Sequence, residues 1–243
     1  MKITAKIIHC NIEHATMMQR GMDNYFKRRE ILFNETIPNL KAIGIESSIV
    51  DAIMYPLLNY NREDENKIFN PLKKLIHLEQ EYTLDNPHPC AFEIALCMGH
   101  LLAWQGEVNV LVLEDDVIIP DDTEVIKKSI EDFLKIEQPA ILYLQATNGN
   151  TVIPKIHLKT YNKDKISIAT ENLYKVDSDY EDWSGSAAYV LNKQGCLNLI
   201  NRAKTSGLRA SDGFIHRAIQ AKDIVAYIPI NYEKSILCHP TLS

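Results

Sequence analysis

Short apolar runs alternate along this chain with longer segments whose apolar residues recur every three or four positions. The short runs are rich in β-branched and aliphatic residues and predict strands at 3–10, 48–54, 108–113, 140–146, 184–192 and 226–230. The helical spacing predicts helices at about 17–43, 91–105, 123–134, 195–202 and 211–221. Strands that alternate with helices predict an α/β fold with a mainly parallel sheet flanked by helices on both faces.

The segment 155–184 does not follow this pattern. It is polar and irregular, and long segments of this kind within a compact domain are usually functional. We therefore expect a lid or an insertion here rather than part of the core. Because the chain has no Gly/Ser-rich linker and no internal repeat, residues 1–243 are expected to form a single domain.

Composition and charge narrow the classes of protein to which this chain can belong. Its 46% hydrophobic and 24% charged residues are typical of a soluble globular protein. The formal net charge of -6 disfavours binding to a nucleic-acid phosphate backbone. No apolar run approaches the roughly 20 residues that a transmembrane helix needs. The five cysteines lie mostly among apolar neighbours, which indicates reduced thiols and a cytoplasmic location.

Three adjacent carboxylates, Glu114, Asp115 and Asp116, directly follow the apolar run 110–113. In open α/β sheets, ligands bind outside the carboxyl ends of the strands, and these residues lie at such an end. Crowded carboxylates raise one another's pKa unless a cation neutralises them, and Mg²⁺ or Mn²⁺ prefers oxygen ligands. The alternative is a solvated turn before a helix, but the next helix is expected to begin several apolar residues later. The motif therefore favours a site for a metal-bound diphosphate.

The expected helix 91–105 carries a second set of candidate residues. Glu93, Cys97, His100 and Trp104 are spaced i, i+4, i+7 and i+11, which places them on one face of a helix. That face either points at a ligand or is a solvated face with a hydrogen-bonded histidine. Spacing alone does not decide between these two interpretations.

Several short motifs follow one another along the chain in a characteristic order. They are HCNIEHATMMQR, VDAIM, EIALCMGHLLAWQ, the Leu-Glu-Asp-Asp at 113–116, GSAAYVL and ASDGF. In this order and at these spacings they resemble the lipopolysaccharide and collagen β-glycosyltransferases, which form glycosyltransferase family 25. The resemblance extends from the first strand to about Ala221. It departs from the family at Gly99, where the family has serine, at Ala95 and Leu96, and over 155–184.

This resemblance implies a GT-A fold, in which a Rossmann-like nucleotide-sugar half is joined to an acceptor half. We expect the first half at about residues 1–120 and the second at about 121–243. The resemblance also implies transfer of a hexose, galactose or glucose, from a UDP-sugar to a saccharide or hydroxylated acceptor, with inversion. Mn²⁺ or Mg²⁺ is the expected cofactor, lipopolysaccharide biosynthesis is the expected process, and a homo-oligomer stays open.

An inverting transfer of this kind assigns roles to single residues. Asp116 is expected to be the principal metal ligand, assisted by Glu114, and His239 can complete the metal shell. Asp212 is expected to be the base that deprotonates the acceptor hydroxyl, with Glu93 as the second choice. A helix N-cap explains Asp212 equally well, and both interpretations stay open.

Contacts to the sugar nucleotide are expected from residues that the family motifs contain. These residues are Asn11, Arg20, His100, Asp115 and Ser186. Of these, Asp115 is expected to touch the ribose or the sugar hydroxyls.

Two other functions remain as alternatives. A nucleotidyltransferase shares the α/β plan and an acidic metal motif, but it usually carries a Gly-rich, basic phosphate loop after the first strand. In HCNIEHATMMQR no glycine occurs before Gly21. A catalytically silent sugar-binding domain of the same fold is the other alternative, and the intact acidic motif argues against it. Release of UDP, of pyrophosphate, or of neither separates the three functions.

Overall fold

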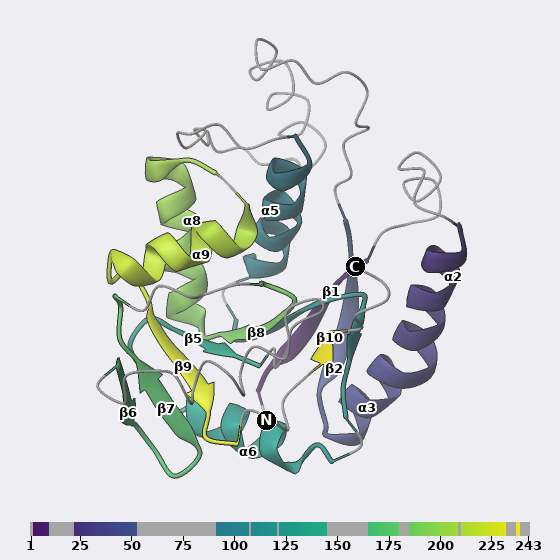
Figure 1. Cartoon of the computed structure of the whole chain (residues 1–243), viewed down its shortest axis with the longest axis horizontal. Helices are drawn as coiled ribbons and strands as arrows, with labels where there is room; N and C mark the ends of the chain where they lie inside the picture. Colours follow the sequence, from purple (N-terminus) through teal and green to yellow (C-terminus); the bar gives the residue numbers. More distant parts are fainter. Residues whose placement is uncertain are drawn as a thin grey trace.

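An eight-stranded sheet forms the centre of the protein, with helices packed on both of its faces (Figure 1). The computed structural model describes residues 2–9, 22–52, 91–106, 108–120, 122–144, 165–179, 185–208, 210–231 and 237–238. In spatial order the strands are β2 (Glu46–Asp51), β1 (Thr4–His9), β3 (Val110–Glu114), β8 (Ala188–Leu191), β5 (Ala140–Tyr143), β9 (Val225–Pro229), β7 (Leu173–Val176) and β6 (Ile166–Ile168). A separate two-stranded sheet pairs β4 (Val117–Ile118) with β10 (Leu237–Cys238).

Most strands of the large sheet point the same way. β1 pairs in parallel with β2 and β3, and β5 pairs in parallel with β9. β8 runs antiparallel to both β3 and β5, β7 is antiparallel to β9, and β6 is antiparallel to β7. Among the described strands of this sheet, β7 and β8 are therefore the reversed ones. This confirms the predicted α/β fold with a mainly parallel sheet flanked by helices.

Two apolar clusters, one on each face of the sheet, form the core. One face is covered by α5 (Ala91–Trp104), α8 (Lys193–Ser206) and α9 (Ser211–Gln220), and the other by α2 (Met22–Ile31), the π-helical η1 (Leu32–Thr36), α3 (Ile37–Ala42) and α6 (Glu124–Phe133). Successive residues of β3 belong to opposite clusters, with Val112 in the first and Leu111 and Leu113 in the second. A strand that is buried on both faces needs an unbroken apolar run, which is why 110–113 contains no polar residue.

The predicted helix 17–43 consists, from Met22 onward, of α2, η1 and α3 in direct succession. Pro38 lies in the first turn of α3, directly after η1, and the chain stays helical through it. Thr36 Oγ1 donates to the carbonyl of Val117 at 2.9 Å, and Asn39 Nδ2 donates to the carbonyl of Ile119 at 3.0 Å. These bonds hold the segment that follows the acidic residues against the helices.

The lid predicted at 155–184 is not confirmed. Its described part, 165–179, contains the β6–β7 hairpin, which extends the sheet beyond β9. Asp132 of α6 accepts hydrogen bonds from Thr170 Oγ1 at 3.0 Å and from Asn172 Nδ2 at 2.8 Å, and so anchors the turn of this hairpin. The remainder of 155–184 lies outside the described residues.

Strands from both expected halves of the chain share the large sheet. β3 precedes residue 120 and β5 follows it, and β8 lies between them. The division into a nucleotide-sugar half and an acceptor half therefore stays a prediction. None of the described helices combines the length and the apolar character that a bilayer crossing requires.

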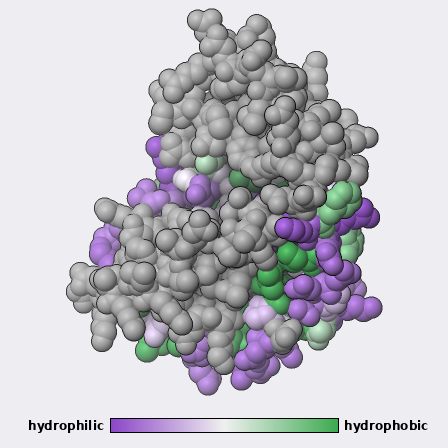
Figure 2. Space-filling view, turned by 45° about the vertical axis from the view of Figure 1, so that its right-hand side comes forward, coloured by the Kyte–Doolittle hydropathy of each residue, from purple (hydrophilic) through white to green (hydrophobic). Residues whose placement is uncertain are grey.

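The exposed apolar side chains of the described part are scattered. Phe26 of α2, Phe33 of η1 and Ile49 of β2 are among them. Figure 2, which brings the α2 side of the molecule forward, shows apolar and hydrophilic residues next to each other on the described part of that face. Isolated exposed apolar residues of this kind are normal on a protein surface.

Candidate active site

The acidic turn lies at the carboxyl ends of three adjacent parallel strands. β1 ends at His9, β2 at Asp51 and β3 at Glu114 (Figure 1). Asp115 and Asp116 form the turn that connects β3 to β4. This edge of an α/β sheet is where ligands characteristically bind, so the position predicted for the site agrees with the fold.

The first two carboxylates of the turn point to opposite faces of the sheet. Side chains alternate along a strand, so Glu114 continues the side of Val112 and Asp115 continues the side of Leu113. Accordingly, Glu114 lies beside His100 of α5, whereas Asp115 contacts Arg28 of α2. The structure therefore divides the three predicted residues between two environments.

Arg28 and His9 hold the carboxylates on the α2 side. Arg28 donates from Nη1 to Asp115 Oδ1 at 2.9 Å, and its Nη2 lies 3.2 Å from Asp116 Oδ2. On the other side of Asp115, His9 Nδ1 lies 2.8 Å from Oδ2. The His9 ring is stacked on the ring of Tyr25, with their centroids 5.9 Å apart. One guanidinium thus bridges two carboxylates that otherwise repel each other.

The charge of the buried Asp116 carboxylate is only partly neutralised by Arg28. Burial raises the pKa of its carboxyl from 3.8 to about 6; Arg28 acts to lower the pKa, while Glu114 and Asp115 raise it further. Asp116 Oδ1 is buried and has no hydrogen-bond partner within the described ranges. A buried carboxylate oxygen without a partner is costly, so this atom marks a position where a ligand would be favourable.

The oxygens of this turn suit a hard divalent cation. Mg²⁺ is commonly held by one or two protein carboxylates and takes its remaining ligands from water and substrate phosphates. Asp116 Oδ1 is one such oxygen, and Glu114, whose side chain is 25% exposed, can supply another. In the part of the chain that the structure describes, no three His, Cys, Asp or Glu side chains are grouped around a common point. The residues therefore fit a cation that depends on the substrate for much of its shell.

Glu114 contacts two side chains on the α5 side of the sheet. His100 Nε2 of α5 lies 3.5 Å from Glu114 Oε1, and Ser186 Oγ donates to the same oxygen at 3.4 Å. Ser186 Oγ in turn lies 2.7 Å from Ser211 Oγ, at the start of α9. The predicted donor contacts His100 and Ser186 are thus brought together at the end of β3, and their contact with a donor stays a prediction.

His100 belongs to a buried hydrogen-bond chain behind Glu114. Its Nδ1 lies 2.7 Å from the hydroxyl of Tyr189 on β8, and Trp104 Nε1 donates to the same hydroxyl at 2.8 Å. All three side chains are almost completely buried. The helix face that carries His100 and Trp104 is therefore not solvated, and the histidine on it is hydrogen-bonded inside the core.

Asp212 lies in the first turn of α9, next to Ser211. The N-cap position is Ala210, so Asp212 is not the N-cap, but its Oδ1 accepts a hydrogen bond from Gly213 N at 2.6 Å. A first-turn N–H is satisfied in this way. The charge of Asp212 also adds to burial in raising the pKa of Tyr143, at the end of β5, above its ordinary value. Whether Asp212 is the base stays a prediction.

Some predicted site residues fall outside the described part. Asn11, Arg20 and His239 belong to segments that the structure does not describe, and of Glu93 only the backbone, in α5, is described. The residue before His239 is Cys238, which pairs with Val117, the residue after Asp116. The roles predicted for these four residues stay predictions.

His9, Arg28 and Tyr189 were not among the site residues predicted from the sequence. His9 follows from the strand register, which the structure provides: Ile8 is in register with Glu114 on adjacent parallel strands, so His9 and Asp115 are the next positions. For Arg28 the sequence offers no comparable signal, because nothing local shows which face α2 covers. Tyr189 stands in GSAAYVL, where it resembles any aromatic core residue.

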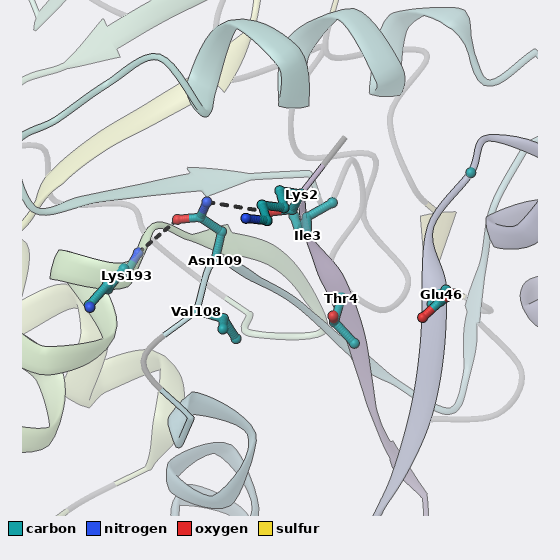
Figure 3. A pocket seen from close by; sticks show the side chains of 8 residues that line it. Lys2, Ile3, Thr4, Glu46, Val108, Asn109 and Lys193 are labelled. Carbon is teal, nitrogen blue, oxygen red and sulfur yellow. Dashed lines mark hydrogen bonds between the residues drawn. The ribbon is translucent and has the colours of Figure 1, made fainter.

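A cavity of about 540 Å³ lies at the opposite edge of the sheet (Figure 3). It is formed where β1 and β3 begin, and its lining includes Lys2, Thr4 and Lys193. Asn109 crosses it, donating from Nδ2 to the carbonyl of Lys2 at 3.4 Å and accepting from Lys193 N at 2.9 Å (Figure 3). The cavity lies at the amino ends of these strands and has no part in the acidic site.

Comparison with known protein families gives one match. Residues 21–215 match the sequence profile described as glycosyltransferase family 25 (LPS biosynthesis protein). No curated protein matches the chain significantly.

Solved structures resemble the chain only distantly. UDP-glucose pyrophosphorylase complexed with UDP-glucose is similar with a TM-score of 0.45 and 14% identity, over 94% of this chain and 91% of that chain. For mouse xyloside xylosyltransferase 1 in its apo form the TM-score is 0.38 with 8% identity, over 92% and 84% of the two chains. For S. aureus TarS 1–349 the TM-score is 0.38 with 13% identity, over 94% and 60%. At these scores the likeness says nothing about the chemistry of this chain.

Proposed function

Because the chain belongs to glycosyltransferase family 25, whose profile covers residues 21–215, we propose that it transfers galactose or glucose from a UDP-sugar. The proposed acceptor is a hydroxyl of a saccharide or of another hydroxylated molecule. The transfer proceeds with inversion and depends on Mn²⁺ or Mg²⁺. Family membership supports a transferase directly, while the donor, the cation and the stereochemistry are the part that we propose.

One observation carries the proposal, namely the buried Asp116 Oδ1 at the carboxyl ends of β1 and β3, which has no hydrogen-bond partner among the described residues. A nucleotide diphosphate is an anion, and by itself the cluster of three carboxylates would repel it. The same cluster attracts a diphosphate once a divalent cation lies between them. The acidic turn therefore supports a sugar-nucleotide donor that binds together with a cation.

Asp116 and Glu114 would hold this cation through carboxylate oxygens, with His239 as the predicted third ligand. When bound, a cation of this kind stabilises the negative charge that develops on the leaving diphosphate. Asp115 has a different task, because Arg28 and His9 each occupy one of its oxygens. A carboxylate oxygen accepts more than one hydrogen bond, so a ribose or sugar hydroxyl can still donate to Asp115.

Asp212 is the proposed base for the acceptor hydroxyl. The N–H of Gly213 holds Oδ1 of this carboxylate and so orients the side chain at the start of α9. Ser211 and Ser186 link the same helix start to Glu114, so α9 begins beside the acidic turn. A proton from the acceptor would pass to Asp212 as the new glycosidic bond forms. Glu93 is the second choice for this role.

Titration calorimetry with UDP tests the donor and the cation. We expect UDP to bind in the presence of Mn²⁺ and to bind much more weakly in excess chelator. Asp116→Asn should abolish this difference, because the substitution removes the proposed ligand charge. Asp132→Asn is the matched control, because Asp132 is an aspartate of α6 that bonds Thr170 and Asn172 at the far edge of the sheet.

A screen of UDP-sugars against simple saccharide acceptors tests the reaction. Release of UDP with transfer of the sugar supports the proposal, and the anomeric configuration of the product, read by NMR, tests inversion. Equal UDP affinity in Mn²⁺ and in chelator would refute the cation assignment. Pyrophosphate release would identify a nucleotidyltransferase, and binding without turnover of any donor would identify a silent sugar-binding domain.

A further inference from the structure

We propose that Trp104 and Tyr189 are positioning residues that orient the His100 ring, so that Nδ1 accepts a hydrogen bond from Tyr189 and the hydrogen on Nε2 is directed at Glu114. The catalytic significance of this arrangement rests on the proposed function, but the arrangement itself does not. It assigns His100 the role of a fixed hydrogen-bond donor. It excludes His100 as a proton acceptor or as a metal ligand while that proton is in place.

The direction of the hydrogen bonds begins at the indole. Trp104 Nε1 carries a hydrogen and can only donate, so the Tyr189 hydroxyl accepts across their 2.8 Å contact. The hydroxyl also has one hydrogen of its own, and burial raises the pKa of Tyr189 well above its ordinary value, so this hydrogen is retained. Among the described residues, the other hydrogen-bonding atom at the hydroxyl is His100 Nδ1, at 2.7 Å.

Tyr189 therefore donates to His100 Nδ1. The opposite arrangement, with a hydrogen on Nδ1, would direct two donors at one oxygen and leave the buried hydroxyl hydrogen without an acceptor. A buried donor without an acceptor is destabilising, and a structure that satisfies every donor avoids this cost. Nδ1 is consequently the unprotonated nitrogen of the neutral ring, and the hydrogen of the ring lies on Nε2.

The Nε2–H points toward the acidic turn. Nε2 is buried, lies 3.5 Å from Glu114 Oε1, and has no hydrogen-bond partner within the described ranges. A distance of 3.5 Å is too long for a strong hydrogen bond. A small movement of Glu114, or an oxygen of a bound donor between the two groups, would complete it. The hydrogen bonds of Trp104 and Tyr189 thus direct the Nε2–H of His100 toward the place where the sugar nucleotide is proposed to bind.

The ring packing supports a fixed orientation. The His100 and Tyr189 rings are stacked with centroids 5.8 Å apart, and the Trp104 ring stacks on Phe214 at 5.9 Å. The imidazole is completely buried, so no water replaces either partner. A half-turn of the ring about the Cβ–Cγ bond would put Cδ2 in the place of Nδ1 and Cε1 in the place of Nε2, and so would break the Tyr189 contact.

NMR of the protein with ¹⁵N-labelled histidine tests the proposal without any substrate. At a pH where imidazoles are neutral, two-bond ¹H–¹⁵N spectra distinguish the two tautomers, and His100→Gln identifies the His100 signals by their absence. We expect the pattern of an unprotonated Nδ1 and a protonated Nε2. The wild-type spectrum decides the tautomer even if variants of the core fail to fold.

Tyr189→Phe tests the positioning role. This substitution removes the donor to Nδ1, so the His100 signals should change to those of a mixture of tautomers. Turnover of the UDP-sugar should fall about tenfold to a hundredfold, as for other lost outer-shell partners. Trp104→Phe should give a smaller change of the same kind. Tyr227→Phe is the matched control, because its buried hydroxyl also accepts from a side-chain N–H, that of Gln138 at 2.6 Å, but in the other apolar cluster.

Each outcome bears on one proposal. A wild-type His100 with its proton on Nδ1, or with both nitrogens protonated, would overturn the inference. Unchanged His100 signals in folded Tyr189→Phe would overturn it as well. If the predicted tautomer is found but no sugar nucleotide is turned over, the proposed function fails and the positioning of His100 stands.

Discussion

Replacing Asp116 by Asn should stabilise the metal-free protein at neutral pH and leave its stability nearly unchanged in acid. Asn resembles the protonated form of Asp in shape and in charge. Burial raises the pKa of the Asp116 carboxyl from 3.8 to about 6, so the folded protein opposes ionisation of this side chain. The substitution removes the charge whose burial is unfavourable and keeps a polar group in its place.

The magnitude follows from the pKa. A rise from 3.8 to about 6 corresponds to a cost of about 3 kcal/mol for ionised Asp116 in the folded state. The folded-state pKa lies above the unfolded value, so this contribution to stability is present below pH 3.8 and is lost as the pH rises to about 6. Above that pH, Asp116→Asn should therefore be more stable than the wild type by up to about 3 kcal/mol.

One opposing effect has to be weighed against this gain. Removing one partner of a buried ion pair usually destabilises a protein, because the other charge is left without a partner. Arg28 is not left in that state, since it still donates to Asp115 at 2.9 Å after the substitution. The pKa of Asp116 is raised even though the attraction to Arg28 acts to lower it. We therefore expect the gain to exceed the loss.

Urea unfolding in excess chelator, at several values of pH from 4 to 8, measures the effect. The difference between variant and wild type should grow as the pH rises and level off above about 6. Asp132→Asn should instead be less stable than the wild type by a constant amount across this range, because hydrogen bonds from Lys135 and Asn172 lower the pKa of Asp132 to about 2. Its stabilising contribution is present above pH 3.8 and is lost toward pH 2. A variant Asp116→Asn that is less stable than the wild type at pH 8 would refute this reasoning.

Three further predictions concern other parts of the structure. Asp212→Asn should slow sugar transfer by about 10²–10⁴-fold with donor affinity unchanged, and near-wild-type turnover would move the role of base to Glu93. Arg28→Gln should destabilise the protein by about 3 kcal/mol in urea unfolding, because two buried carboxylates lose their shared cation, and unchanged stability would show that the pair is not coupled to folding. Gly195→Ala should cost about 1–3 kcal/mol, because its Cβ would lie 2.6 Å from the carbonyl oxygen of Ala140, and an unchanged melting temperature would contradict that close approach.

The hydrophobic pattern by itself determined six of the eight strands of the large sheet, all except β6 and β7, and the position of the acidic turn. The run 110–113 is apolar because β3 is buried on both faces, and the carboxylates follow where the strand ends. A strand and its carboxyl end are local features, so they can be predicted from adjacent residues. The helix 91–105 was predicted for the same reason and is observed as α5.

The sequence did not predict the structure of residues 165–179. A polar, irregular segment suggested a lid, yet this part pairs as the β6–β7 hairpin at the edge of the sheet. β6 is largely exposed, and an edge strand of this kind needs few apolar residues. Polarity therefore showed that the segment lies at the surface and did not show whether it pairs with the sheet.

Which groups meet the carboxylates was decided by the tertiary structure alone. His9 and Arg28 reach Asp115 over sequence separations of 106 and 87 residues, and Tyr189 reaches His100 over 89. These contacts exist because β1 lies beside β3, β8 lies on the other side of β3, and α2 and α5 cover opposite faces. Local periodicity shows that each side chain has a buried face, but it contains no information on strand order. The partners of Asp115 and of His100 follow from that order, because it fixes which strand ends lie within hydrogen-bonding distance.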